Sequence, residues 1–415
     1  MFSRSLLFVL VTGLSCLPGV AWAEDRLSLT RAVSQALTGN PRLRAAEHQI
    51  AAAKAREIQA AAFPNPNLTL IVDQVPLPNP LNGNYMAGIS QPLWLGGQHE
   101  SRMAVAKLDT QLAELDYAIL RREMAANVRN EFARLLLAQA GYRFSLLSEG
   151  SAATIRKAAE SRYKAGEVAR IEVLQAQVEH SRAQREVAAA DSRQVRARGK
   201  LNILLGQQAQ SPIVVDEPAK PERLSLAPVD DLIKQGLTNR PELRRAALMI
   251  QHETLQQQLA RTSVWTGTEV TAAAGAVAGQ AGFSATMTVP IPIYQQQGEV
   301  AEANADRLRA EAERLALANE ITLDVQNAYH EARSSFQLIE LFQKTYLQQA
   351  ERLADNARRR FVAGEGSGFE VLEARRSQRD VQAAYQQVLL EYRQALTNLE
   401  RAVGQDLADM PHDGH

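Results

Sequence analysis

The sequence is almost free of cysteine, which excludes a disulfide framework. One cysteine, Cys16, occurs in 415 residues, and it lies close to the N-terminus. Small secreted folds that are held together by cross-links need several paired cysteines. The stability of the folded chain must therefore come from packing and from assembly.

The first 23 residues have the composition of a signal peptide. Arg4 precedes a short apolar stretch, and residues 21–23 (AWA) place small side chains where a signal peptidase reads them. We predict cleavage before Glu24, which leaves the exported chain without a thiol. In the alternative, Cys16 is the lipidated first residue of a lipoprotein, although Gly13 occupies the position where a bulky aliphatic residue is expected.

The chain has no net charge that would attract nucleic acid. Lysine plus arginine and aspartate plus glutamate each number 46, so no general field favours a polyanion or an anionic membrane surface. Long apolar runs are also missing after the leader, and none approaches the roughly 18 to 20 residues that a membrane helix needs. If the exported chain crosses a membrane, it must do so with strands.

Internal similarity indicates that one unit occurs twice. Residues 36–50 (ALTGNPRLRAAEHQI) match 236–250 (GLTNRPELRRAALMI), and 162–176 (RYKAGEVARIEVLQA) match 360–374 (RFVAGEGSGFEVLEA), in the same order and at nearly one offset. Chance similarity between alanine-rich helices would give scattered offsets, so we infer a tandem duplication. The predicted parts are a signal peptide at 1–23, a first repeat at 24–226, a second repeat at 227–408 and a disordered tail at 409–415.

Glycine and proline are missing from residues 299–361, which predicts an unusually long helix. At about 1.5 Å per residue this rod would reach roughly 95 Å, more than a compact domain needs. The first repeat has a similar rod over 98–163, which Gly141 and Gly150 are expected to weaken or bend. An apolar stripe for packing against other helices is predicted on the second rod, at Ile321, Val325, Ala328, Ala332, Ile339, Phe342, Tyr346 and Leu353.

Each repeat has two short stretches of strand character before its rod. In the first repeat they are 67–75 and 84–92, separated by proline- and asparagine-rich turn material. In the second they are 266–274 and 283–289, around a glycine and alanine turn at 275–282. Apolar residues share one strand face at Leu68, Leu70 and Val72, and likewise at Phe283, Ala285, Met287 and Val289.

Two interpretations of these strands remain open. They are either strands that cross a thin apolar layer at a tilt or soluble hairpins that cap the helices. Four strands cannot close a barrel, and open sheet edges cannot face lipid. In the first case several subunits must therefore share one barrel.

The arrangement resembles the TolC family of outer-membrane efflux channels. The motif that carries the likeness is an aromatic-x-Ala-Gly turn at the end of each rod, YKAG at 163–166 and FVAG at 361–364, each followed by Glu-Val-Leu. The likeness covers essentially the whole exported chain. Residues 89–98 (ISQPLWLGGQ) are also similar to the matching segment of channels that serve heavy-metal RND efflux systems of the cobalt-zinc-cadmium type.

The resemblance implies a mainly α fold with a small β part, assembled as a homotrimer. Three copies of four strands would close a twelve-stranded β-barrel in outer-membrane lipid, and the long coiled-coil helices would form a periplasmic tunnel. A periplasmic adaptor (membrane fusion protein) and an inner-membrane RND pump are the implied partners. Conduction would be passive, with the energy supplied by the pump, and the exported compound, metal ion or drug, is not determined by the sequence.

The two turns are expected to form the periplasmic tips of the tunnel. Gly166 and Gly364 end their rods, where a positive φ favours glycine, and Tyr163 and Phe361 stand three residues before them. The resemblance implies that these tips touch the adaptor. Ordinary helix connections would show the same residues.

Glu370 and Glu373 lie three residues apart and share a helix face. The resemblance implies that acidic residues at these positions line the constriction at the closed entrance, where threefold symmetry would form carboxylate rings that favour cations. The first repeat keeps Glu172 but has Gln175 in place of Glu373, so the second repeat is expected to supply most of the lining. A solvated helix face is the alternative.

Arg358, Arg359 and Arg360 precede the second turn and could latch the entrance by pairing with Glu365 or Glu370. They could equally complement the negative end of a helix. The best-known member of the family carries a basic residue soon after its turn glycine, whereas this chain has Gly366. That departure weakens the latch hypothesis.

No metal centre or catalytic apparatus is recognisable in the sequence. The histidines of the body are widely separated. His412 and His415, with Asp409 and Asp413, make a small ligand-rich tail, which either binds metal or is a disordered end. No glycine-rich phosphate loop follows a strand, and no serine elbow occurs. We therefore expect no enzyme, no cofactor and no nucleic-acid partner.

The alternative to a channel is a periplasmic coiled-coil adaptor or scaffold. Such a protein would be expected to carry one helical hairpin rather than two repeats with strand pairs.

Overall fold

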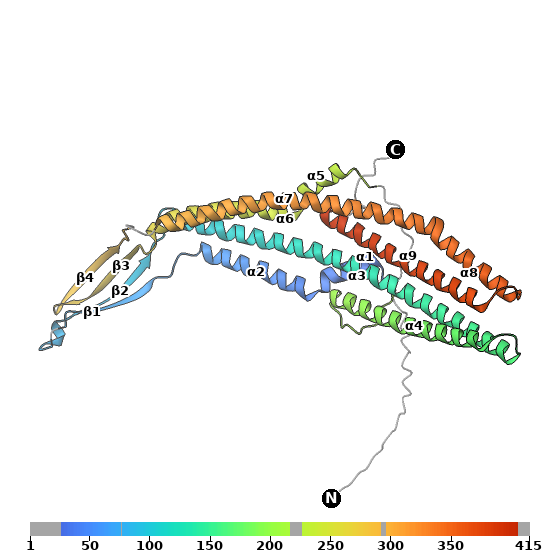
Figure 1. Cartoon of the computed structure of the whole chain (residues 1–415). Helices are drawn as coiled ribbons and strands as arrows, with labels where there is room; N and C mark the ends of the chain where they lie inside the picture. The colour runs from blue at the N-terminus through green and yellow to red at the C-terminus, as the bar shows by residue number, and fades with distance from the viewer. Residues whose placement is uncertain (1–25, 76, 216–225, 292–295, 406–415) are drawn as a thin grey trace, which may run out of the picture.

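The computed structural model describes residues 26–75, 77–215, 226–291 and 296–405, which form one elongated molecule (Figure 1). A four-stranded sheet lies at one end, and two helical hairpins end side by side at the other. Long helices connect the two ends. The predicted signal peptide with Cys16, and the tail with His412 and His415, lie outside the described residues.

The order of elements in the first half of the chain recurs in the second. The first half contains α1 (Leu29–Gly39), α2 (Pro41–Ala61), β1 (Asn67–Asp73), β2 (Asn84–Pro92), α3 (Gln98–Lys164) and α4 (Arg170–Leu204). The second contains α5 (Val229–Asn239), α6 (Pro241–Thr262), β3 (Glu269–Val277), β4 (Gln280–Thr288), α7 (Gln296–Leu341), α8 (Leu347–Val362) and α9 (Gly368–Val403). The predicted mainly α fold with a small β part is confirmed.

The first rod is one uninterrupted helix. α3 has 67 residues and remains α-helical through Gly141 and Gly150, so these glycines do not break it. The second rod contains the irregularity instead, a π-helical segment at Phe342–Tyr346 between α7 and α8. Figure 1 shows α8 turning away from the line of α7 there, as expected where a π segment inserts into an α-helix.

The π segment also shifts the packing stripe of the second rod by one residue. Ile339 is buried as predicted, but Tyr346 and Leu353 are 45% and 52% exposed, and the adjacent Ala354 is fully buried instead. A π turn accommodates one more residue than an α turn. The predicted stripe is therefore wrong beyond the π segment, where small residues such as Ala350 take the buried positions.

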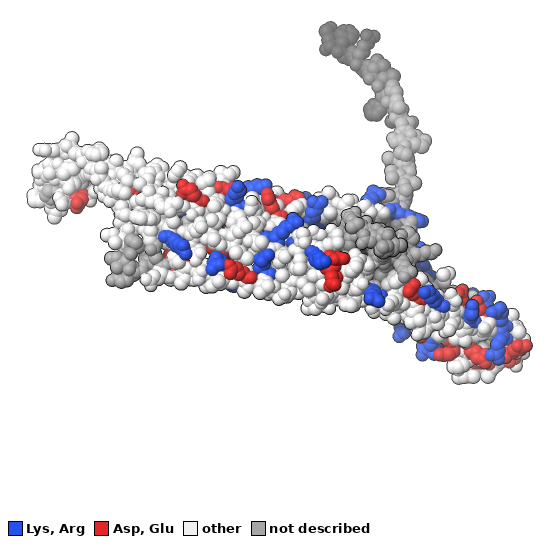
Figure 2. All heavy atoms as spheres, turned by 90° about the horizontal axis from the view of Figure 1, so that it is seen from above, with Lys and Arg blue, Asp and Glu red and all other residues white. Residues whose placement is uncertain are grey.

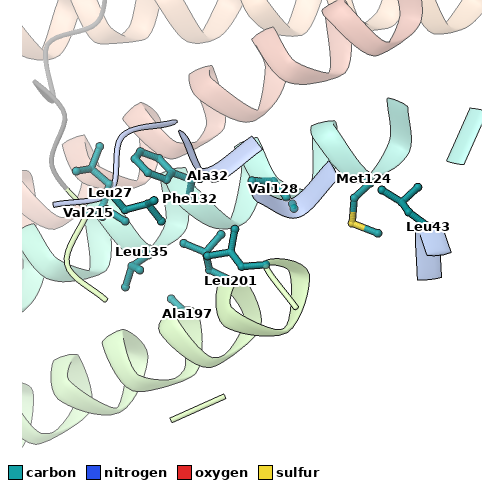
Figure 3. Packing of buried hydrophobic residues seen from close by; sticks show 13 residues of the cluster. Leu27, Ala32, Leu43, Met124, Val128, Phe132, Leu135, Ala197, Leu201 and Val215 are labelled. Atoms are coloured by element: carbon teal, nitrogen blue, oxygen red, sulfur yellow. The ribbon is translucent and has the colours of Figure 1, made fainter. Parts of the chain in front are cut away.

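The largest hydrophobic core lies at mid-length, where α1 packs on the α3–α4 hairpin. Ala32 of α1 meets Val128, Phe132 and Leu135 of α3, and Leu201 of α4 closes the cluster (Figure 3). A second cluster repeats this arrangement around α5, with Leu232 against Val325 of α7 and Leu399 of α9. Each short helix therefore stabilises the middle of one hairpin by covering its apolar side.

The four strands form one antiparallel sheet in the order β1-β2-β3-β4. All four predicted strands are present, but the glycine and alanine turn predicted at 275–282 is wrong. Gly275 and Gly282 pair with each other inside β3 and β4, and the turn is only Ala278 and Gly279, both with positive φ. Glycine is needed at 275 because a Cβ there would lie 2.0 Å from the Tyr85 carbonyl oxygen of β2.

Candidate functional site

One face of the sheet carries apolar side chains that point to solvent. Residues paired across antiparallel strands share a face, and exposure is high at Leu68 (74%), Leu70 (70%) and Phe283 (73%). Three neighbouring rows contain only aliphatic or aromatic residues: Leu68, Ile89, Ala272 and Ala285; Leu70, Ala87, Ala274 and Phe283; Val72, Tyr85, Ala276 and Ala281. An exposed apolar surface of this extent marks a contact with lipid or protein.

Small and polar residues predominate on the opposite face of the sheet, the polar face. Two of its rows are Thr69, Gly88, Ala273 and Ser284, and Asn67, Ser90, Thr271 and Thr286, and a third row contains Ile71, Met86, Gly275 and Gly282. The outermost strands, β1 and β4, each pair with one neighbour only. Their outer edges therefore present unpaired backbone groups beside an apolar surface, an arrangement that favours pairing with another chain.

Aromatic rings gather where the sheet meets the helices, a feature that the sequence analysis missed. Trp94, just after β2, stacks on His99 with ring centroids 5.1 Å apart, and Phe63 stacks on the same histidine at 4.7 Å. The Arg102 guanidinium lies 5.0 Å from the Trp94 ring. Trp265 lies close by, packed against Gly96. Aromatic residues of this kind concentrate at membrane–water interfaces.

Charged side chains concentrate on the helical part of the molecule. On the face shown in Figure 2, they spread over the rods and crowd at the hairpin tips, while the sheet end shows almost none. Among the described residues, no helix is both long enough and apolar enough to pass through a bilayer.

The two tip turns have the same backbone geometry. Gly166 and Gly364 have φ of 78° and 79°. In each turn the following N–H donates to a carbonyl five residues earlier, from Glu167 to Arg162 and from Glu365 to Arg360, both at 2.9 Å. These bonds form the helix-ending motif that places glycine in the left-handed region, which is the physical reason for the repeated Ala-Gly pair.

The two tips also contact each other. Arg162 at the end of α3 lies 4.9 Å from the Phe361 ring at the end of α8, so Phe361 is partly buried while Tyr163 is exposed. Arg162 also pairs with Glu167 at 3.1 Å. The first hairpin therefore supports the second at the point where both turn.

The three predicted pore carboxylates do not form one cluster. Glu370 and Glu373 are exposed on α9, where Glu370 pairs with Arg360 at 3.2 Å and Glu373 with Arg376 at 2.9 Å. Glu172 lies on α4 and faces the start of α9, with its Oε2 3.4 Å from the position that a Cβ on Gly368 would take. Their assignment to the pore stays a prediction, because it depends on an assembly.

The three arginines before the second turn behave differently from one another. Arg360 contacts Glu370 and also donates to the Glu365 carbonyl oxygen at 3.4 Å. Arg359 donates to Asn356 at 2.9 Å, and Arg358 is exposed on α8. Only Arg360 has the geometry of the proposed latch, and it links α8 to α9 within one hairpin.

A stronger link between the hairpins centres on Glu179 of α4. This carboxylate is 5% exposed and accepts hydrogen bonds from Arg376 and, at 3.1 Å, from Arg379, both on α9. Arg182 of α4 adds a third bond at 2.6 Å. Burial raises the pKa of Glu179, but the hydrogen bonds from Arg376 and Arg379 outweigh burial, so the pKa lies below its ordinary value.

The sequence contained one signal for this site that the sequence analysis did not use. Val173, Ala176 and Ala183 form a buried stripe on α4, and Glu179 occupies the stripe position between the last two. A lone carboxylate on a buried stripe needs partners, because an isolated buried charge is very costly. The partners themselves come from α9, about 200 residues away.

A cavity of about 150 Å³ adjoins the Glu179 cluster. Phe144 and Leu147 of α3 form an apolar wall, and Leu372 and Arg375 of α9 form the other side. No group of three or more potential metal ligands occurs within the described residues. The cavity lies at the junction between the two hairpins, because its lining comes from α3 and α4 of the first and α9 of the second.

Comparison with known proteins identifies relatives along nearly the whole chain. The cobalt-zinc-cadmium resistance protein CzcC of Cupriavidus metallidurans is 27% identical over 390 residues, covering 92% of this chain and 91% of CzcC. The solved outer-membrane channel OprN superposes with a TM-score of 0.75 at 19% identity, covering 91% of this chain and 90% of OprN. CusC, solved in a study of folding and transmembrane channel formation, gives 0.74 at 17% identity over 91% and 92%.

These likenesses confirm the predicted TolC-like fold. The solved relatives are channel proteins, not enzymes. The family model described as outer membrane efflux protein matches residues 32–207 and again 232–405. Because these two matches span most of the sequence, the chain belongs to the outer membrane efflux protein family.

Proposed function

We propose that three copies of the chain form an efflux channel in the outer membrane. In this assembly β1 of each copy pairs with β4 of the next, and twelve strands close a barrel whose apolar face contacts lipid. The sheet supports this assembly, because it combines three apolar, exposed rows with two unpaired edges. In hydrocarbon each unpaired backbone group would cost several kcal/mol, so the edges must meet.

The helical part forms the periplasmic tunnel of this channel. With 67 residues, α3 spans about 100 Å, and both hairpin tips lie at the end opposite the sheet (Figure 1). The tips, with Gly166, Gly364, Tyr163 and Phe361, are the surface offered to a periplasmic adaptor and through it to an inner-membrane RND pump. The channel conducts passively, and the pump supplies the energy.

Heavy-metal cations are the proposed cargo. The relative CzcC is named for resistance to cobalt, zinc and cadmium, and the carboxylates Glu370 and Glu373 are exposed on α9 near the tip. In a trimer they would form negative rings that favour cations over anions. A passive duct needs no coordinating ligands, because its specificity is inherited from the pump.

Membrane fractionation tests the assembly. The exported protein should appear in the outer membrane as a detergent-resistant trimer, and its mass should show whether it begins at Glu24 or at a lipidated Cys16. A soluble periplasmic monomer would instead favour the adaptor or scaffold alternative.

Complementation tests the cargo. In a strain that lacks the outer-membrane component of a metal efflux system, the protein should restore growth on cobalt, zinc or cadmium when its pump and adaptor are present. Restored resistance to organic drugs without metal resistance would contradict the proposed cargo but leave the channel intact.

A further inference from the structure

Glu269 holds an isolated negative charge on the polar face of the sheet. It is the first residue of β3, and its neighbour Val270 lies on the apolar side, paired with Met287. Because successive side chains of a strand point to opposite faces, Glu269 shares the face of Ser90 and Thr271. Its register partners are Pro92 of β2 and Thr288 of β4, so it lies at the end of the sheet nearest the helices.

A hydrogen bond keeps this carboxylate on the polar face. The Ser90 hydroxyl, itself 4% exposed, donates to Glu269 Oε2 at 2.8 Å. No arginine, lysine or histidine is paired with Glu269 in the part of the chain that the structure describes. The carboxylate is therefore positioned by a neutral donor, which does not cancel its negative charge.

The four strands contain acidic residues but no basic residues. The segments 67–73, 84–92, 269–277 and 280–288 contain no lysine, arginine or histidine, and their only acidic residues are Asp73 and Glu269. Asp73 pairs with Asn84 at the opposite end of the sheet, and the alternation of β1 places it on the polar face as well. This face has one negative charge at each end and no positive charge between them.

We infer that Glu269 sets part of the charge selectivity of the channel, at the place where the barrel joins the helical tunnel. The inference rests on the proposed trimer, in which the polar face lines the lumen and three Glu269 carboxylates encircle it. Such a ring concentrates cations and repels anions. Its effect is confined to about 8 Å at physiological ionic strength, so it should be strongest in dilute salt.

Cysteine accessibility tests where the side chain points. Whether Cys16 is removed with the leader or lipidated, the exported chain carries no free thiol, so a single introduced cysteine can be followed. Glu269→Cys in the reconstituted full-length channel should react with a membrane-impermeant, charged methanethiosulfonate, whereas the matched control Val270→Cys should not. Reaction at 270 and protection at 269 would overturn the assignment of the faces and with it the inference.

Reversal potentials across planar bilayers in a potassium chloride gradient test the charge effect. Glu269→Gln, which can still accept the Ser90 hydrogen bond, should lower the ratio of potassium to chloride permeability by about twofold in dilute salt, and by less as the salt concentration rises. Asp231→Asn on α5, which removes one exposed charge far from the sheet, is the matched control and should leave the ratio unchanged. Ser90→Ala keeps the charge and should likewise retain most of the selectivity.

The same measurement in a Glu370→Gln/Glu373→Gln background isolates the barrel from the tip. Loss of Glu269 should lower the remaining cation preference there as well. The inference would be overturned if the channels conduct but their selectivity is the same with and without Glu269, and also unchanged after Glu269→Cys has reacted with a positive methanethiosulfonate. The proposed channel function would survive that result. A wild-type protein that forms no conducting trimer would overturn the proposed function itself.

Discussion

Glu179 of α4 and Arg376 of α9 form an ion pair across 197 residues of sequence and join the two helical hairpins above their tips. Arg376 also contacts Glu373, one of the predicted pore carboxylates. The arginine therefore connects a buried carboxylate to an exposed one. Through Arg376, the contact between α4 and α9 adjoins the α9 face that carries Glu373.

Glu179→Gln should loosen the contact between α4 and α9. The substitution removes the negative charge that holds Arg376 and Arg379. We expect the free energy that stabilises the contact between α4 and α9 to fall by about 1–2 kcal/mol, a modest value because both arginines are partly exposed. Hydrogen exchange of the detergent-solubilised protein should show faster exchange in both helices. Glu186→Gln is the matched control, because its pair with Arg193 is 52% exposed on both sides, and it should have little effect. Equal exchange in both variants would contradict the role assigned to Glu179.

The Glu179 link should weaken in acid. Burial opposes ionisation, but bonds from Arg376 and Arg379 outweigh it and hold the pKa of Glu179 below its ordinary value of 4.5. A depressed folded-state pKa contributes stability that is complete above that ordinary value and is lost as the pH falls through the lower, folded-state value. The distance between spin labels on α4 and α9 should thus stay constant from neutral pH to about pH 5 and increase below 4.5. Glu179→Gln should remove this pH dependence.

Gly364→Ala should destabilise the second tip turn. The position has a φ of 79°, and an added Cβ would meet nothing within 4 Å, so the cost is backbone strain alone, about 1 kcal/mol. Gly166→Ala should behave alike. Gly150→Ala is the control, because Gly150 lies inside α3 with open space around it, and alanine should stabilise the helix there by about 0.5–1 kcal/mol. Local hydrogen exchange, measured at each turn and in α3 around residue 150, distinguishes the opposite signs.

Neutralising Glu370 and Glu373 together should reduce the preference of the open channel for cations. Both carboxylates are exposed on α9, and the loss of Glu370 also releases Arg360 from its pair at 3.2 Å. Reversal potentials should shift toward chloride, and more strongly than for Glu172→Gln on the first hairpin. Unchanged selectivity in the double variant would remove these residues from the pore.

Leu70→Lys should impair insertion into the outer membrane. Leu70 is exposed on the apolar face of the sheet, and lysine at the lipid-facing centre of a barrel costs about 2–4 kcal/mol. Thr69→Lys adds the same charge one residue away on the polar face and should be tolerated. Outer-membrane yield of the folded trimer measures the difference. Equal yields for the two variants would contradict the assignment of the apolar face to lipid.

Much of the fold follows from local signals in the sequence. The stretch without glycine or proline predicted the second rod, and the Ala-Gly pairs before Glu167 and Glu365 predicted where both hairpins turn. These signals can be recognised in the sequence because helix propensity and the positive φ of a turn glycine depend on only a few neighbouring residues. The strand positions were also predicted, although β3 begins three residues later than expected.

The errors arise where distant segments decide the outcome. Gly275 looked like turn material, but it lies within a strand because Tyr85 of β2 leaves no room for a side chain. Leu353 fitted the apolar stripe, but the π segment rotated it away from the core. A short window of sequence does not reveal either effect. The first depends on a neighbouring strand, and the second depends on a helical irregularity in the preceding segment.

The sequence by itself determined the order of helices and strands, the place of both tip turns, and the family likeness that the repeated motifs carry. Only the tertiary structure brought Glu179 to Arg376 and Arg379, joined the two strand pairs into one sheet with a continuous apolar face, and placed Glu269 on the opposite side. Backbone preferences are set by the nearest residues along the chain. Charge pairing and the alignment of faces are set by packing between segments that are about 200 residues apart.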